Sequence, residues 1–95
     1  ELIKGDILET VPNFIEKNPH ILVSLLYLDA VVYKPTITAL EHFVPKMPKG
    51  SIIAFDELNS PLWPGESIAV HEFFKVNEIE IQRINFSSAI SYAVL

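Results

Sequence analysis

Two apolar runs that each end in acidic residues constrain the fold of this chain more than any other feature. The run from Leu25 to Leu28 ends at Asp29, and the run from Ile52 to Phe55 ends at Asp56 and Glu57. Continuous apolar runs of this kind indicate strands of a parallel sheet that are buried on both faces. Because 27 residues with one helix-like segment separate Asp29 from Asp56, a single βαβ crossover would bring these acids together. They would then lie at the carboxyl edge of the sheet, where α/β proteins place their ligands.

The segments around these runs complete the expected crossover. We expect the first strand to span His20 to Asp29 and the second to span Ser51 to Asp56. Between them, Lys34-Pro35-Thr36 opens a helix whose apolar residues recur every three or four positions until Pro45, as they do on an amphipathic helix. The connection is expected to be right-handed, as nearly all such connections are.

The flanking segments predict the rest of a small α/β domain. The five-residue connection 85–89 is too short for a parallel crossover, so the last strand must return antiparallel. The further elements expected are a strand end at Glu1–Lys4, a helix from Thr10 to Asn18, a helix at Glu66–Val76, an edge strand at Glu78–Ile84 and a reversed strand at Ile90–Leu95. The predicted fold class is therefore α/β: half of a three-layer sandwich, with a mixed, mostly parallel sheet and a reversed C-terminal hairpin.

Composition excludes several classes of protein. The net charge is −5 and no cluster of basic residues is present, which argues against a nucleic-acid partner. The longest apolar stretch, Ile21 to Tyr33, is too short to cross a membrane and contains Asp29. No cysteine is present, which excludes disulfides and thiolate chemistry and is compatible with the cytoplasm, the expected location.

Hydrophobic residues make up 49% of a chain of only 95 residues, which is rich for a free-standing domain of this size. We therefore expect some apolar surface to meet another chain or a missing part of this one. An open apolar edge of the strand at His20–Asp29 would favour pairing between copies, so the sequence predicts a homodimer through an exposed sheet edge.

Four short motifs resemble one enzyme family. They are Gly5-Asp6-x-x-Glu9-Thr10-x-Pro12, Leu28-Asp29-Ala30-Val31-Val32-Tyr33-Lys34-Pro35-Thr36, Met47-Pro48-Lys49-Gly50 and Phe55-Asp56-Glu57. Together they resemble the macrocin O-methyltransferase-like branch of the class I S-adenosylmethionine-dependent methyltransferases, which have a Rossmann-like fold. The resemblance covers residues 1–95 and only the carboxyl-terminal half of that domain, so we interpret the chain as a fragment.

The resemblance implies roles for four acidic residues. Asp29, Asp56 and Glu57 match the positions that hold a divalent cation, which we take to be Mg²⁺, and Asp6 matches a position near the adenine of S-adenosylmethionine. Carboxylate oxygens are the ligands that Mg²⁺ prefers. The residues alone favour solvated strand ends for Asp29, Asp56 and Glu57, and Asp6 could be a turn residue that bonds its own backbone.

Two aromatic residues fall in loops on the expected ligand side. Tyr33 and Trp63 are candidates for the wall of a substrate pocket, although single aromatic residues in loops more commonly serve local packing. Both a pocket wall and local packing therefore stay open for Tyr33 and Trp63.

Two functions follow from these observations. The first is a divalent-metal-dependent O-methyltransferase that acts on a hydroxyl of a small molecule such as a sugar or a natural product. Val31 stands where the family carries a second acid, and the glycine-rich cofactor-binding turn is absent, so the chain alone is expected to bind S-adenosylmethionine poorly and to be inactive. The alternative is a non-catalytic α/β interaction module, or a degenerate methyltransferase, that self-associates.

Overall fold

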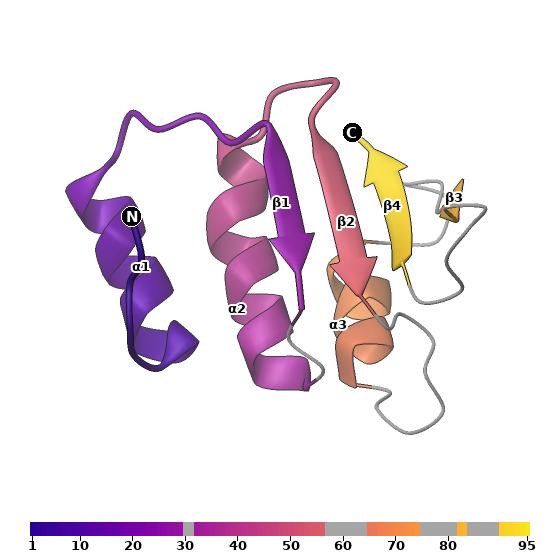
Figure 1. Cartoon of the computed structure of the whole chain (residues 1–95), viewed down its shortest axis with the longest axis horizontal. Coiled ribbons are helices and arrows are strands. Elements are labelled where there is room, and N and C mark those ends of the chain that lie inside the picture. Colours follow the sequence, from indigo (N-terminus) through magenta and orange to yellow (C-terminus); the bar gives the residue numbers. More distant parts are fainter. Residues whose placement is uncertain (30–31, 57–64, 75–81, 84–89) are drawn as a thin grey trace.

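The computed structural model describes residues 1–29, 32–56, 65–74, 82–83 and 90–95. In chain order its elements are α1 (Ile7–Lys17), β1 (Leu25–Leu28), α2 (Tyr33–Phe43), the short 3₁₀ helix η1 (Val44–Lys46), β2 (Ile52–Asp56), α3 (Gly65–Phe73), β3 (Gln82–Arg83) and β4 (Ile90–Val94). Figure 1 shows these elements along the chain. No helix in the described part of the chain is long and apolar enough to span a membrane.

The sheet has the strand order β1-β2-β4-β3. Strands β1 and β2 are parallel, whereas β4 runs antiparallel to both of its neighbours, β2 and β3. The last strand is thus inserted between two earlier ones, which confirms the predicted mixed sheet and reversed C-terminal strand. Of the predicted edge strand at Glu78–Ile84, β3 accounts for Gln82 and Arg83, while residues 78–81 and 84 lie outside the described part.

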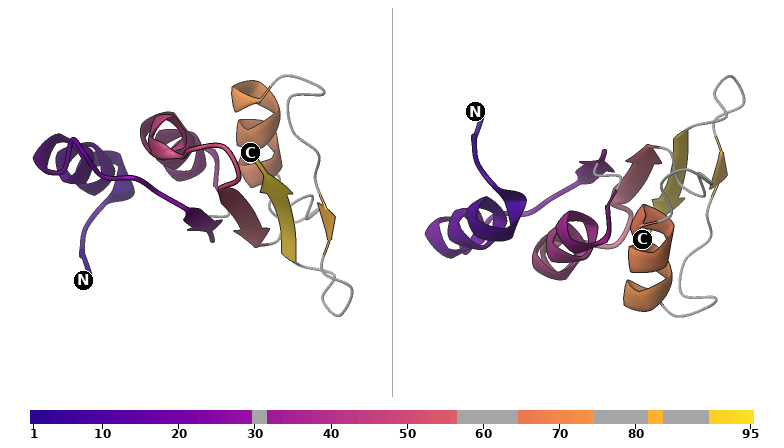
Figure 2. Two further views of the ribbon diagram at one scale, coloured as in Figure 1. Left: turned by 90° about the horizontal axis from the view of Figure 1, so that it is seen from above. Right: turned by 90° about the horizontal axis from the view of Figure 1, so that it is seen from below.

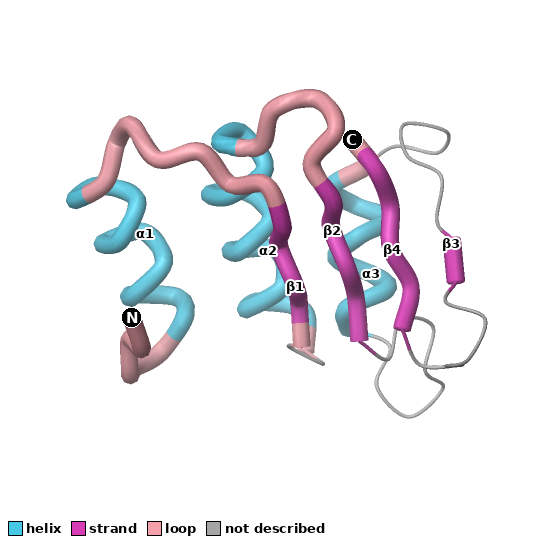
Figure 3. Tube along the Cα trace, turned by 45° about the horizontal axis from the view of Figure 1, so that its top comes forward, coloured by secondary structure: helices cyan, strands magenta, loops and turns pink. Residues whose placement is uncertain are grey.

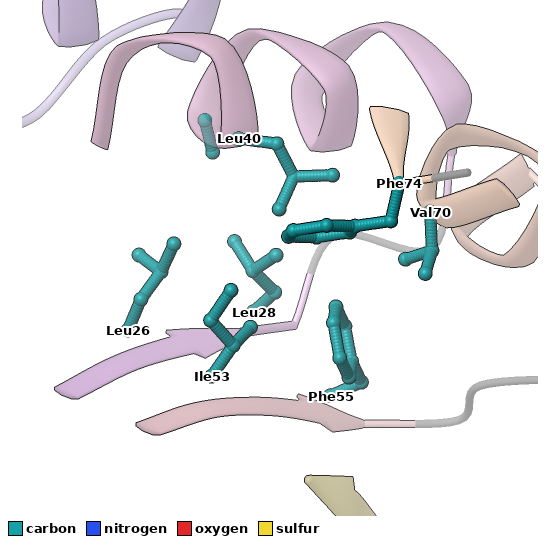
Figure 4. Packing of buried hydrophobic residues seen from close by; sticks show 8 residues of the cluster. Leu26, Leu28, Leu40, Ile53, Phe55, Val70 and Phe74 are labelled. Atoms are coloured by element: carbon teal, nitrogen blue, oxygen red, sulfur yellow. The ribbon is translucent and has the colours of Figure 1, made fainter. Parts of the chain in front are cut away.

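Helices α2 and α3 cover one face of the sheet, and α1 lies on the same side but beyond β1 (Figure 2). The core lies between α2, α3 and this face, and Figure 4 shows how its side chains meet. Its members are Leu26, Leu28, Ala39, Leu40, Ile53, Phe55, Val70 and Phe74. The alternate residues Leu26 and Leu28 of β1 and the predicted apolar stripe of α2 therefore supply one core.

The opposite face of the sheet is open within the described residues. Leu25 and Tyr27 of β1 are 60% and 50% exposed, and Val94 of β4 is 49% exposed. The prediction that the first strand is buried on both faces was therefore wrong, because the described helices cover only one of its faces. The described elements accordingly form two layers of the expected three.

The first strand also begins later than predicted. Residues 20–24 form no strand, because their backbone groups bond to the connection between α2 and β2. Val23 N–H donates to the carbonyl oxygen of Lys46 at 2.9 Å, and Ser51 Oγ donates to that of Val23 at 3.1 Å. Lys46 Nζ donates to the carbonyl oxygen of Pro19 at 2.7 Å. The amino ends of β1 and β2 are thus fastened together before the ladder starts.

The chain's amino end differs from the prediction as well. Residues 1–4 form no strand, and α1 begins at Ile7, three residues before the expected start. The physical reason is that Asp6, not Thr10, caps the helix. Helix α3 begins at Gly65, one residue before the predicted start, and ends at Phe73, and residues 75–76 of the predicted helix are outside the described part.

The carboxyl end of β4 is anchored to the start of β2. Leu95 N–H donates to the carbonyl oxygen of Ser51 at 2.9 Å, and Gly50 N–H donates to that of Leu95 at 2.8 Å. This anchoring places β4 directly against β2 along its whole length.

Replacing Leu40 with alanine should destabilise the fold strongly. Leu40 is fully buried between α2 and the sheet, and such truncations cost about 2–5 kcal/mol through lost burial and the cavity left behind. Urea denaturation measures the change. Leu22→Ala is the matched control, because Leu22 is 75% exposed and its truncation should change stability by no more than about 0.5 kcal/mol. Equal losses for both variants would contradict this account of the core.

Candidate functional site

Asp29 and Asp56 are placed at one edge of the sheet by the pairing of β1 with β2. The two strands pair in register from Leu25 with Ile52 to Leu28 with Phe55, so the next residue along each strand is one of the two acids. Both strands end at the lower edge of the sheet in Figure 3. Asp29 is exposed and Asp56 is half-buried. The register of β1 against β2 therefore brings Asp29 and Asp56 to adjacent strand ends, as predicted.

Two other predicted site residues, Glu57 and Trp63, lie outside the described part of the chain. Among the described residues, no three acids or histidines are gathered closely enough to hold a metal ion. The described site thus consists of two carboxylates on adjacent strand ends, which suit a hard cation in their chemistry. The metal role of Asp29, Asp56 and Glu57 stays a prediction.

Tyr33 makes a contact that the sequence did not suggest. Its phenolic hydroxyl, at the start of α2, donates a hydrogen bond to Glu72 Oε2 of α3. The two residues are 39 positions apart, and no local pattern links a helix-opening tyrosine to an exposed acid on another helix. The bond joins the two helices that cover β1 and β2. The predicted role of Tyr33 in the wall of a substrate pocket stays a prediction.

This hydrogen bond perturbs the titration of Tyr33. The bond to Glu72 raises the pKa of the Tyr33 phenol above its usual value of 10.0, with smaller contributions from burial and from the negative charges of Glu72 and Glu41. All of these effects favour the neutral phenol over the phenolate.

Ultraviolet titration of the tyrosines should show Tyr33 ionising above pH 10.0, because Glu72 stabilises the protonated phenol. A folded-state pKa above the unfolded value means that the contribution to stability is fully present below the unfolded pKa. It is then lost as pH rises through the folded pKa. The stability difference between the wild type and Tyr33→Phe should therefore disappear at strongly alkaline pH. Glu72→Gln should move the Tyr33 pKa downward, and an unchanged midpoint in that variant would show that the bond does not form.

Asp6 serves as the N-cap of α1. Its side-chain Oδ1 accepts a hydrogen bond from the Leu8 N–H at 3.0 Å, which satisfies one of the free donors at a helix start. The preceding Gly5 has φ of +138°, and a Cβ there would meet Thr10 Cγ2 at 2.8 Å. The Gly5-Asp6-x-x-Glu9-Thr10 motif therefore has a structural explanation in the start of α1. A role of Asp6 beside the adenine stays a prediction.

The Asp6 cap can be tested by substitution. Asp6→Ala should destabilise the chain by about 1 kcal/mol, whereas Asp6→Asn should retain most of the stability because its amide oxygen can still accept the Leu8 N–H bond. Thermal denaturation of the two variants measures the difference. A loss in Asp6→Asn as large as that in Asp6→Ala would show that the charge, and not the cap, is what matters.

A groove lies away from the two acids, beside α1. It has a volume of about 450 Å³ and is lined by Glu1, Ile3, Ile7, Thr10, Val11, Phe14 and Phe43. Its lining is mostly apolar and comes from the amino-terminal segment, α1 and the end of α2. The hydrophobic composition predicted some uncovered apolar surface but did not place it beside α1.

With its reversed last strand and its acids at parallel strand ends, the chain has the Rossmann-like methyltransferase fold. Two solved structures of methyltransferases carry this comparison. One is the apo structure of CalS11, a TDP-rhamnose 3′-O-methyltransferase of calicheamicin biosynthesis, and the other is CalS11 described as a calicheamicin methyltransferase. Each matches 98% of this chain at 39% sequence identity and a TM-score of 0.93.

The chain spans 40% and 36% of the lengths of those two solved chains. No family model matches the sequence, and no curated protein matches it. The expectation of a methyltransferase fold is therefore confirmed, whereas assignment to the macrocin-like branch stays a prediction.

Proposed function

We propose that this chain is part of an S-adenosylmethionine-dependent O-methyltransferase that acts on a hydroxyl of a small molecule, and that the acceptor is a sugar or a natural product bearing one. The observation that carries the proposal is the match, over 98% of the chain at 39% identity, to a TDP-rhamnose 3′-O-methyltransferase. Because the match covers 98% of the chain, it includes the carboxyl ends of β1 and β2, where folds of this kind place their ligands.

The acceptor site is proposed at the carboxyl ends of β1 and β2. Asp29 is exposed there and Asp56 is half-buried beside it, so a carboxylate pair is accessible from solvent. Together with Glu57, these residues would hold Mg²⁺ through oxygen ligands. A bound cation of this kind supplies Lewis acidity that lowers the pKa of an acceptor hydroxyl.

Tyr33 is proposed to contribute its ring to this site. Its hydroxyl is engaged by Glu72, so the phenol is held in place and presents an aromatic face rather than a free donor. Trp63, by sequence position, would supply a second aromatic wall. These two aromatic rings would orient the acceptor molecule for the reaction.

The second candidate function is a non-catalytic interaction module that self-associates. The open apolar face that contains Leu25, Tyr27 and Val94 favours this candidate, since uncovered apolar patches mark contact surfaces. It predicts a homodimer without methyl transfer, in the cytoplasm. The first candidate is preferred because it accounts for the two acids at the strand ends.

A chimera in which this chain replaces the matched part of CalS11 tests the methyltransferase proposal. We expect it to transfer a methyl group from S-adenosylmethionine to TDP-rhamnose, and we expect EDTA to suppress the transfer. Asp56→Asn and Asp29→Asn should each lower kcat by about tenfold or more, since each carboxylate lost weakens cation binding.

Glu16→Gln is the matched control for the chimera, because Glu16 is an exposed acid on α1 and its replacement should leave the rate unchanged. Isothermal titration of S-adenosylmethionine, with and without Mg²⁺, completes the test. The isolated chain should give no heat. Transfer that is unaffected by EDTA and by both aspartate substitutions would remove the metal from the proposal. A chimera that binds the cofactor and transfers nothing would favour the interaction module.

A further inference from the structure

The start of helix α2 lacks the local stabiliser that the start of α1 has. The Asp6 side chain caps α1, whereas the N-cap residue of α2 is Val32, which makes no side-chain cap bond. The first turn of α2 contains no acidic residue either. Because the first N–H groups of a helix have no intrahelical partners, an uncapped start is less stable than a capped one.

Two side-chain hydrogen bonds hold this uncapped turn. Thr36, which is fully buried, donates from Oγ1 to the carbonyl oxygen of Val32 at 2.8 Å. Tyr33, the first residue of α2, donates from its hydroxyl to Glu72 Oε2 of α3. The first bond holds the turn to itself, and the second holds it to the neighbouring helix.

The turn held in this way lies directly after the candidate site. Asp29 follows the last residue of β1, and Tyr33 opens α2 four positions later. Figure 1 shows the start of α2 close to the end of β1. A connection this short can move little when both of its ends are fixed. The order of the α2 start therefore limits the positions that the Asp29 carboxylate can take.

The other partner of the bond is carried by a fixed element. Val70 and Phe74, which flank Glu72 in the sequence, belong to the same buried core as Leu40 of α2. Figure 4 shows Phe74 lying between α2 and Phe55 of β2. The Glu72 side chain itself is exposed. Glu72 is thus an acceptor whose backbone the core holds in place.

The bond between Tyr33 and Glu72 is placed to affect geometry more than stability. Glu72 is exposed, and an exposed hydrogen bond contributes little net free energy because water competes for both partners. Reaction rates depend far more steeply on geometry, since a displacement of about 1 Å can lower a rate by about 100-fold. Loss of this bond should therefore change the placement of Asp29 more than the stability of the fold.

We propose that Glu72 is a positioning residue for the candidate site. Through the Tyr33 hydroxyl it fixes the start of α2, and through the start of α2 it limits the movement of Asp29. In this role Glu72 acts on the reaction only through other residues. The inference rests on the proposed function for the reaction that Asp29 serves, whereas the ordering of the α2 start is independent of it.

Kinetics of the CalS11 chimera test this role. Glu72→Ala and Tyr33→Phe should each lower kcat by about tenfold or more, while KM changes by less than about threefold. Tyr33→Phe keeps the aromatic ring, so its loss of rate reports on the hydroxyl. The double variant should be no slower than either single variant, because all three lack the same bond. Additive losses, or an unchanged kcat in Glu72→Ala, would overturn the proposal.

Two glutamine variants separate the bond from the charge. Glu72→Gln keeps an oxygen that can accept the Tyr33 bond and should hold kcat within about threefold of the wild type. Glu41→Gln is the matched control, because Glu41 is an exposed acid of α2 whose charge also acts on Tyr33. Its kcat should be unchanged. A loss in Glu41→Gln equal to that in Glu72→Ala would assign the effect to charge and contradict positioning.

Thermal denaturation separates positioning from a purely structural role. The melting temperature of the Glu72→Ala chimera should fall by no more than about 4 °C, as expected for one exposed hydrogen bond in a protein of that size. A larger fall, with kcat recovered at lower temperature, would show that Glu72 only stabilises the fold.

A double-mutant cycle tests the route through Asp29. In the Asp29→Asn chimera, adding Glu72→Ala should lower kcat by less than about twofold further, because the carboxylate that Glu72 positions is already gone. A further tenfold loss would show that Glu72 does not act through Asp29.

Hydrogen exchange of the 95-residue chain tests the ordering without any reaction. Peptides that cover the start of α2 should exchange about tenfold faster in Glu72→Ala than in Glu41→Gln, and equal exchange would overturn the proposal. A chimera that transfers no methyl group, together with faster exchange in Glu72→Ala, would support the positioning by Glu72 and count against the proposed function.

Discussion

The parallel pairing of β1 with β2 is the interaction on which the rest of the structure depends. Its register joins Leu25 to Ile52 and Leu28 to Phe55, so each residue of β1 pairs with the residue 27 positions later in the chain. The inward side chains of the two strands then meet α2 and α3 in one core. The same register brings Asp29 and Asp56 to neighbouring strand ends. The core and the candidate site therefore both depend on the pairing of β1 with β2.

Sequence reasoning succeeded where local pattern and chain topology agree. The two apolar runs, the crossover helix between them and the short 85–89 connection predicted a mixed sheet with a reversed last strand, and the observed strand order confirms it. Its failures have physical causes. Residues 20–24 have a strand-like sequence, but their backbone bonds to the α2–β2 connection. Helix α1 begins before the expected Thr10 because Asp6 caps it. The predicted burial of β1 on both faces was wrong because a continuous apolar run does not show which elements cover the strand, and Leu25 and Tyr27 are exposed.

For the candidate site, the sequence located the two aspartates because strand register is encoded in the spacing of apolar runs. It missed the bond between Tyr33 and Glu72, which depends on how α2 and α3 pack. Asp6 illustrates a different limit: its side chain caps α1 in this structure, and its predicted place beside a cofactor stays a prediction.

The insertion of β4 between β2 and β3 has a consequence for biosynthesis. One edge of β2 stays uncovered until the chain has been synthesised as far as Leu95, whose backbone bonds to Gly50 and Ser51. A ribosome delivers β1, α2 and β2 well before that point. The nascent chain must therefore carry an open, apolar strand edge through the synthesis of some forty residues, which exposes it to chaperones and to misassembly with neighbouring nascent chains.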